Sequence, residues 1–194
     1  MKIYLIRHGE SQSNYDKKNG NHYFCGQMDV PLTEKGEQSA VDLQTYFADK
    51  EIDHVYLSDL TRTKQTAQGI FPNDKVPKTE TPLLRERSLG KFEGEMVDEL
   101  EQSTEFAQYF NDEAYKYFRH SFSQKAPEGE SYADVLYRVE QFFKNEVQAQ
   151  DDNIAIVAHQ VVIRCILVYF GYESKESAVD TKVENCVPYV LNIK

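Results

Sequence analysis

The sequence predicts an α/β fold in which helices cover an open β-sheet. Apolar runs of strand length, at residues 3–6, 52–57 and 154–158, alternate with longer segments in which apolar residues recur at helical spacing. The first and third runs are each followed within two residues by a histidine, as expected of buried strands that deliver polar side chains at their carboxyl ends. Open α/β sheets bind their ligands at that edge.

The first half of the chain supplies two strands and a helix between them. Residues 3–6 form the first strand. Thr33 is expected to cap a helix whose apolar residues recur at helical spacing: Ala40, Leu43 and Phe47. Residues 52–57 form the second strand, and the turn at residues 58–63 leads into another helix and brings Arg62 to a strand end.

The second half contains a long helix and the clearest strand. The segment at about 95–126 is charged and aromatic with a weak helical pattern, so we predict a lid-like insertion there. After a turn at residues 127–131, one face of a long helix is apolar: Val135, Leu136, Val139, Phe142, Phe143 and Val147. Residues 154–158 form a buried strand that delivers His159. Residues 187–193 are expected to close the sheet as an antiparallel edge strand.

Composition limits the class of protein. With 194 residues and 40% hydrophobic content, the chain has enough apolar side chains for one core, so we expect a single domain over residues 1–194. The apolar runs are too short to span a membrane and the first residues lack a signal peptide, so we expect a cytoplasmic protein that does not bind membranes. The net charge of -10 disfavours nucleic acid as a partner, although a few arginines in one pocket still attract a small anion.

The sequence contains no pattern typical of a metal or disulfide site. Cys25, Cys165 and Cys186 have no Cys-x-x-Cys spacing and are expected to be reduced thiols. The five histidines include no pair spaced like His-Glu-x-x-His, which argues against a metal-dependent hydrolase. We therefore expect neither a metal nor another cofactor.

The strongest chemical signal is a pair of histidines that follow apolar strands, each accompanied by arginine. His8 follows Arg7, and His159 precedes Arg164 by five residues. A single histidine at a strand end is more often a hydrogen-bonded polar residue than a catalytic group. Two of them together with Arg62 favour a site, because several guanidinium groups converging on a histidine imply a bound anion, and their planar donors match phosphate oxygens.

Five sequence blocks, in order, resemble those of the histidine phosphatase (phosphoglycerate mutase-like) superfamily. They extend over nearly the whole chain, which makes the resemblance far more specific than the short Arg-His-Gly motif alone. The blocks are Arg7-His8-Gly9-Glu10 with Asn14, Gly26-x-x-Asp29-x-Pro31-Leu32-Thr33-x-x-Gly36, Ser58-x-Leu60-x-Arg62-Thr63-x-Gln65-Thr66-Ala67, Leu84-Arg85-Glu86-Arg87 with Gly90-x-Phe92-Glu93-Gly94, and Val157-Ala158-His159. The resemblance implies a three-layer α/β/α sandwich with a mostly parallel sheet.

The resemblance also implies roles for the catalytic residues. His8 would attack phosphorus and form a covalent phosphohistidine. Arg7, Arg62 and His159 would hold the phosphoryl oxygens and stabilise their charge during transfer, so that no metal is needed. Glu86 would protonate the departing alcohol and then activate water. Without the motif, Glu86 would instead be interpreted as a solvated loop carboxylate.

Other residues are expected to bind the substrate. Asn14 and backbone amides near Gly26 and Gln27 would donate hydrogen bonds to it. A second group resembles the fructose-2,6-bisphosphatase branch of the family, in which the matching positions contact the sugar bisphosphate: Tyr132, Gln160 and Arg164. On the residues alone, Gln160 is equally well a helix-starting polar residue, and Tyr132 a partly buried aromatic.

The expected function is hydrolysis of a small phosphorylated metabolite, such as a sugar phosphate or bisphosphate, by a metal-independent phosphomonoesterase. Phosphoglycerate mutase-type transfer is the first alternative, and a non-catalytic phospho-ligand binding protein is the second. Lys116 and Arg119, in the insertion, are candidates for a second anion site, although such charges more often form a solvated face. The sequence leaves the substrate and the oligomeric state open.

Overall fold

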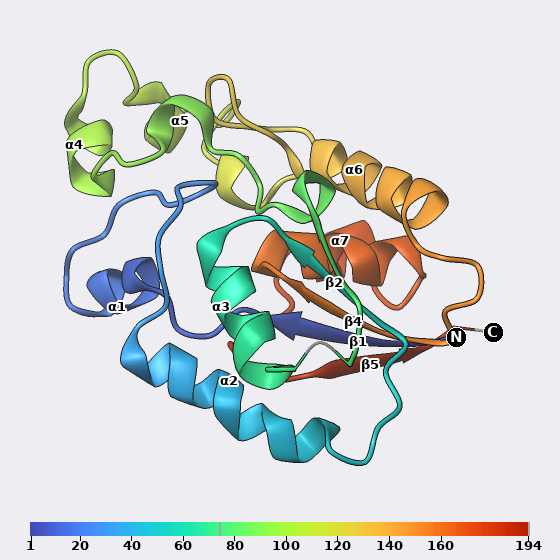
Figure 1. The fold of residues 1–194 in the computed structure, drawn as a ribbon. Helices are drawn as coiled ribbons and strands as arrows, with labels where there is room; N and C mark the ends of the chain where they lie inside the picture. The colour runs from blue at the N-terminus through green and yellow to red at the C-terminus, as the bar shows by residue number, and fades with distance from the viewer. Residues whose placement is uncertain (74, 194) are drawn as a thin grey trace.

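The computed structural model describes residues 1–73 and 75–193, which form a five-stranded sheet in the order β3-β2-β4-β1-β5 (Figure 1). β1 and β4, β2 and β4, and β2 and β3 pair in parallel, whereas β1 and β5 are antiparallel. The strands are β1 (Lys2–Arg7), β2 (His54–Ser58), β3 (Lys78–Thr81), β4 (Asn153–Ala158) and β5 (Tyr189–Asn192). The predicted mostly parallel sheet with an antiparallel edge strand is confirmed.

Helices cover both faces of this sheet, giving the predicted α/β/α sandwich. α6 and α7 lie on one face, and α2 and α3 lie on the other (Figure 1). The helices are α1 (Gln12–Lys18), α2 (Glu34–Phe47), α3 (Thr61–Ile70), α4 (Val97–Gln102), α5 (Gln108–Asn111), α6 (Tyr132–Asn145), α7 (Gln160–Tyr169) and α8 (Lys175–Ala178). Three short 3-10 helices are η1 (Pro82–Leu84), η2 (Gly90–Phe92) and η3 (Phe118–His120).

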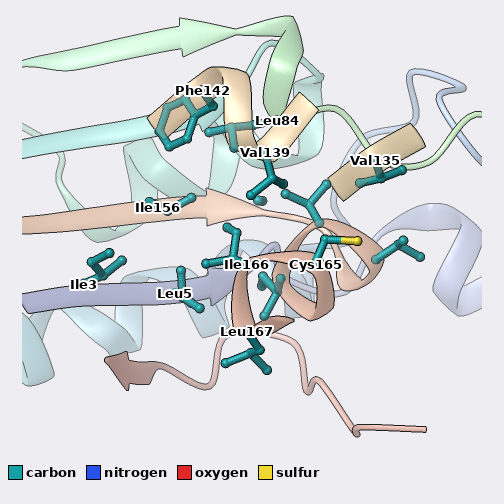
Figure 2. Close-up of a cluster of buried hydrophobic side chains, with 14 of the residues drawn as sticks. Ile3, Leu5, Leu84, Val135, Val139, Phe142, Ile156, Cys165, Ile166 and Leu167 are labelled. Carbon is teal, nitrogen blue, oxygen red and sulfur yellow. The ribbon is translucent and has the colours of Figure 1, made fainter. Parts of the chain in front are cut away.

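The two-residue period of the strands divides the core into two layers. On β1, Ile3 and Leu5 face the α6 and α7 side, while Tyr4 and Ile6 face the α2 and α3 side. β4 divides its side chains in the same way. Figure 2 shows Ile3, Leu5 and other aliphatic side chains meeting those of α6 and α7 in the first layer. A strand buried on both faces reads as a continuous apolar run, which is why β1 and β4 were predictable.

Capping residues fix where the two long helices begin. The hydroxyl of Thr33 accepts a hydrogen bond from the amide of Gly36 and starts α2, as predicted. Ser131 and Asp134 form a reciprocal capping box that starts α6. The apolar face of α6 then lies against the sheet and α7.

The lid-like insertion predicted at about 95–126 carries α4, α5 and η3 and contributes most of a third apolar cluster, separate from the two layers on the sheet. In Figure 1, α4 and α5 lie apart from the helices that cover the sheet. The cluster joins the insertion to residues that precede it, and its buried members are Phe24, Phe92, Val97, Leu100, Phe118 and Ala126. The insertion is thus folded and packed against earlier residues, whereas its movement as a lid and the single-domain organisation stay predictions.

The cysteines and the lengths of the helices bear on the expected cellular location. Cys25, Cys165 and Cys186 are free thiols, as predicted. Within the described part of the chain, none of the helices has the length and apolar character required to cross a bilayer. The cytoplasmic location stays a prediction.

Truncating Phe142 tests the packing of α6 on the sheet. Its side chain is fully buried against Tyr56 and Phe143. Phe142→Ala is expected to lower the free energy of unfolding by about 3–5 kcal/mol, because it removes a large apolar side chain and leaves a cavity. Tyr137, which is 64% exposed on the same helix, is the matched control, and Tyr137→Ala should change that free energy by about 0.5 kcal/mol or less. If urea denaturation shows similar decreases in the free energy of unfolding for the two variants, the assignment of the buried face of α6 is wrong.

Candidate active site

The two predicted histidines meet at the carboxyl ends of adjacent parallel strands. His8 follows β1, His159 follows β4, and their ring centroids are 5.2 Å apart. A cavity of about 230 Å³ opens at this edge. Seven predicted site residues line it: Arg7, His8, Asn14, Gly26, Arg62, Glu86 and Gln160.

His8 is held as a neutral imidazole with one nitrogen free to react. Its Nδ1 lies 2.7 Å from the carbonyl oxygen of Gly9. A carbonyl only accepts hydrogen bonds, so Nδ1 carries the proton and Nε2 keeps its lone pair. Burial, followed by the charges of Arg62 and Arg7, holds the pKa of His8 well below its usual value. This protonation state is the one a nucleophile requires.

Contacts from distant segments hold the backbone around His8. The amide of Gly9 donates to Thr66 Oγ1 at 3.0 Å, and the side-chain amide of Asn185 donates to the carbonyl of His8 at 2.7 Å. A Cβ at Gly9 would lie 2.5 Å from the carbonyl oxygen of Gly36, so the close approach of the loop after β1 to the first turn of α2 requires glycine. Thr66 stands in a recognised sequence block, but no local pattern pointed to Asn185.

Backbone carbonyls, rather than carboxylates, position the two arginines beside His8. Arg62 is buried and donates to the carbonyls of Met28 at 2.7 Å and Gly26 at 3.0 Å. Arg7 donates to the carbonyl of Val183 at 2.8 Å. Neither arginine forms an ion pair with another described residue. Two guanidinium groups that form no ion pair with the described residues favour the binding of an anion in this cavity.

Arg7 also contacts Gln160, the first residue of α7. Its Nη1 donates to Oε1 of Gln160 at 3.1 Å. Burial is the largest influence on Arg7 and lowers the pKa of its guanidinium. Gln160 thus lies at the cavity and orients a cationic group there, which a merely helix-starting residue would not do.

His159 lies directly behind the cavity wall and makes a contact that the sequence did not predict. Its Nε2 is 2.8 Å from Ser58 Oγ, which in turn is 2.8 Å from Thr63 Oγ1. Its Nδ1 is buried without a hydrogen-bond partner among the described residues. Burial, with Arg62, His8 and Arg7, holds the pKa of His159 well below its usual value. The hydroxyl of Ser58 therefore fixes the ring while one nitrogen remains unsatisfied.

Glu86 lies in the loop after η1 and lines the same cavity as His8. Its Oε1 accepts from the amide of Arg87 at 2.8 Å, and its Oε2 lies 3.4 Å from the amide of Val161 in the first turn of α7. The side-chain amide of Gln27 donates to the carbonyl of Glu86 at 2.9 Å. These contacts keep the carboxyl group at the cavity.

The predicted amide donors to the substrate divide into two groups. Asn14 and Gly26 line the cavity, and Asn14 Oδ1 accepts from the amide of Ser11 in the capping box of α1. The expectation for Gln27 requires correction, because its backbone amide donates to Glu93 Oε1 at 3.0 Å and Gln27 does not line the cavity. Glu93 was not predicted to have this role.

Tyr132 and Arg164 also differ from the expectation of direct contact in the main cavity. Tyr132 is fully buried in the core, and its hydroxyl accepts from Arg164 Nη1 at 2.9 Å. Arg164 lines a neighbouring hollow of about 680 Å³, whose walls also include Arg7 and Gln160. Tyr132 lines neither space, because the packing of α6 places its ring in the apolar layer. Its contact with Arg164 is the hydrogen bond that its hydroxyl accepts, which positions the guanidinium.

The two cations proposed for a second anion site lie outside the cavity. Lys116 pairs with Glu113. The guanidinium of Arg119 lies 5.1 Å from the ring centroid of Phe24 and pairs with Glu101 at 3.9 Å. Neither lines the cavity that contains His8.

Comparison with known proteins identifies relatives over most of the chain. The model of the histidine phosphatase superfamily (branch 1) matches residues 3–194. A 6-phosphofructo-2-kinase/fructose-2,6-bisphosphatase from Caenorhabditis elegans is 33% identical over 170 residues, which are 87% of this chain and 34% of that protein. The chain thus spans about a third of that relative's length. A 2,3-bisphosphoglycerate-dependent phosphoglycerate mutase 2 from Gloeobacter violaceus is 29% identical over 192 residues, 96% of this chain and 83% of that protein.

A solved structure agrees with these relatives. The alpha-ribazole phosphatase from Shigella flexneri is similar with a TM-score of 0.83 and 28% identity, over 100% of this chain and 91% of that chain. The sequence match, the shared fold and the paired histidines at the strand ends lead to one family. The chain belongs to the histidine phosphatase superfamily.

Proposed function

We propose that this protein is a phosphatase that hydrolyses a small phosphorylated metabolite through a phosphohistidine intermediate on His8. The observation that carries the proposal is the state of His8: its Nδ1 proton is bound to a carbonyl, and its Nε2 is free beside two guanidinium groups without carboxylate partners. A nucleophile is thereby placed next to fixed positive charge. The relatives named as phosphatases and bisphosphatases support this reading.

In the first step, Nε2 of His8 attacks phosphorus and the bond between phosphorus and the ester oxygen breaks. Arg7 and Arg62 stabilise the negative charge on the oxygens of the phosphoryl group in transit. Glu86, protonated at this stage, gives its proton to the departing oxygen, so that an alcohol leaves rather than an alkoxide. The products are the alcohol, phosphohistidine and the carboxylate of Glu86.

In the second step, water attacks the phosphoryl group and the bond between phosphorus and Nε2 breaks. The Glu86 carboxylate accepts a proton from the attacking water, which restores the carboxylic acid. His8 returns to the neutral state that its burial favours. Inorganic phosphate leaves, and the site is ready for another cycle.

Mutase-type transfer is the second candidate, supported by the relatives named as phosphoglycerate mutases. A mutase would use the same phosphohistidine but return the phosphoryl group to an alcohol instead of water. The rates of hydrolysis and of exchange between 2- and 3-phosphoglycerate separate the two activities directly. A non-catalytic binding role finds less support, because His8, Arg7, Arg62 and Glu86 all line the cavity and His159 lies beside His8.

Replacing His8 tests the nucleophile. His8→Ala is expected to lower turnover by about 10⁴-fold or more and to abolish phosphoenzyme formation, because it removes the nitrogen that attacks phosphorus in the proposed mechanism. His22→Ala, outside the cavity, serves as the matched control and should retain turnover. Near-normal turnover of a folded His8→Ala variant would refute the assignment.

Replacing Glu86 tests the proton donor. Glu86→Gln should slow hydrolysis of a sugar phosphate by about 10²-fold or more, since an alkoxide leaves poorly without a proton. With an aryl phosphate, the rate of the first step should fall less, because the phenolate leaves without a proton. Phosphohistidine should then accumulate, because water is no longer activated for the second step. The hydrolysis rates of both esters are measured, and the phosphoenzyme is trapped by denaturation without acid, because phosphohistidine is acid-labile. Glu95 is exposed, and Glu95→Gln is the control variant, which should behave like the wild type. Equal losses on both esters without trapped intermediate would assign Glu86 another role.

Adding a chelator tests whether the positive charge of the side chains is enough for hydrolysis without a metal ion. Among residues 1–73 and 75–193, no group of three or more His, Cys, Asp or Glu side chains is placed to hold a metal ion. In the proposed mechanism Arg7 and Arg62 supply the positive charge, so hydrolysis is expected to continue at the same rate in excess chelator. Loss of the rate on chelation, with recovery after a divalent ion is added, would contradict this mechanism.

A further inference from the structure

His159 is a buried titratable group that takes no step in the mechanism above. Its side chain is fully buried, and its two ring nitrogens have different surroundings. Nε2 lies 2.8 Å from Ser58 Oγ, whereas Nδ1 is buried without a hydrogen-bond partner among the described residues. The nitrogen that carries the proton decides whether Nδ1 is able to donate a hydrogen bond to an anion bound beside His8.

Two hydroxyl groups behind His159 allow this proton to be placed by counting donors. The Thr63 hydroxyl donates to the carbonyls of Leu60 at 2.7 Å and Ser58 at 2.8 Å, which only accept. The same hydroxyl oxygen lies 2.8 Å from Ser58 Oγ. Because the single proton of Thr63 is directed to the carbonyls, the hydroxyl proton of Ser58 is the one that lies between the two hydroxyl oxygens.

The Ser58 hydroxyl therefore faces His159 as an acceptor. Its single proton is donated to Thr63, and its oxygen also accepts from the amide of Leu60 at 3.3 Å. Nε2 of His159 is then the nitrogen that carries the ring proton, and Nδ1 of the neutral ring has a lone pair. In the free protein His159 thus has no N–H group available for the oxygens of an anion.

The charges around His159 keep it neutral until an anion binds. Burial, followed by the positive charge of Arg62, holds the pKa of His159 well below its usual value. A dianion between Arg7 and Arg62 would offset this positive charge and place acceptor oxygens beside the ring, and both effects favour the imidazolium. Charged or titratable groups face the ring from each element packed around it: Arg7 and His8 from the end of β1, Arg62 from α3, Arg138 from α6, and Glu86 from the loop after η1.

We propose that Ser58 and Thr63 are positioning residues that keep the proton of His159 on Nε2, so that Nδ1 takes up a second proton from solvent when an anion binds. The lone pair of Nδ1 forms the new N–H bond, which donates to an oxygen of the anion, and the bond from Nε2–H to Ser58 is retained. Anion binding is thereby coupled to the uptake of one proton. This inference rests on the anion site of the proposed phosphatase and adds how its affinity responds to pH.

The test measures the binding of sulfate, a dianion that does not itself titrate near neutral pH. The reference protein is the His8→Ala, Glu86→Gln double variant, because these two side chains also line the cavity and are able to bind a proton. Calorimetry in buffers of different ionisation enthalpy should show uptake of about one proton per sulfate. The Kd should fall about 10-fold for each unit by which the pH is lowered, from the raised pKa of His159 in the complex down to its low pKa in the free protein.

Thr63→Val tests the positioning role. Valine has a similar shape but no hydroxyl, so the Ser58 proton is free to turn to Nε2, and the neutral ring is able to carry its proton on Nδ1 instead. In the reference background, this variant should bind sulfate with uptake of less than about half a proton. Ser58→Ala should have the same effect, because it removes the acceptor that holds the proton on Nε2, and it provides the test if Thr63→Val does not fold. The ¹⁵N resonances of the His159 ring should show the proton moving from Nε2 to Nδ1.

Thr61→Val is the matched control, since Thr61 stands in the same turn of α3 but its hydroxyl donates to Asp29 at 2.9 Å. It should keep the proton uptake of the reference protein, and added His159→Asn should abolish that uptake. Absence of sulfate binding, or sulfate binding without proton uptake, in the reference protein would overturn the inference, and so would uptake that persists in Thr63→Val or His159→Asn. Hydrolysis by the wild type is measured separately, and failure to hydrolyse any ester, an aryl phosphate included, would instead contradict the proposed function.

Discussion

Burying guanidinium groups without carboxylate partners is the constraint on which the site depends. A carboxylate paired with Arg7 or Arg62 would neutralise the charge that the proposed phosphate ligand needs. Backbone carbonyls of Gly26, Met28 and Val183 hold these side chains instead. Dipoles position a guanidinium without cancelling its charge. The loops that carry these carbonyls must therefore converge on the edge of the sheet, and the packed α/β/α layers provide the rigid base for them.

The same positive charge determines the state of the two imidazoles. Near Arg7 and Arg62, a protonated histidine would meet like charge in a buried setting, so both rings are held neutral. The neighbouring hydrogen bonds then decide which nitrogen is available. At His8 the Gly9 carbonyl leaves Nε2 free, while at His159 the Ser58 hydroxyl leaves Nδ1 without a partner. One electrostatic environment thus keeps both imidazoles neutral, while their neighbours leave a different nitrogen free in His8, the proposed nucleophile, and in His159.

The insertion connects the fold to the outer part of the cavity. Its aromatic cluster packs against Phe24 and Phe92, which lie in the chain before it. Arg87 links this unit to the loop that carries Glu86, because it donates to two carbonyls of η3. A change in the packing of the insertion would therefore reach the residue next to the proposed proton donor.

Local patterns in the sequence determined the elements whose physics is local. Continuous apolar runs predicted β1 and β4 because both strands are buried on two faces, and the residues that follow them placed His8 and His159 together at the carboxyl edge of the sheet. The β3 strand was not predicted, because Lys78–Thr81 is a polar edge strand without such a run.

Only the tertiary structure decided which groups meet across long sequence separations. Asn185 reaches the carbonyl of His8 from 177 residues away, and Ser58 meets His159 across 101 residues. Tyr132 is in the core and the Gln27 amide is bound to Glu93, although the motifs suggested substrate contacts for both. Sequence motifs specify residue types at strand ends, whereas the packing of helices and loops fixes where each side chain points and which donors remain free.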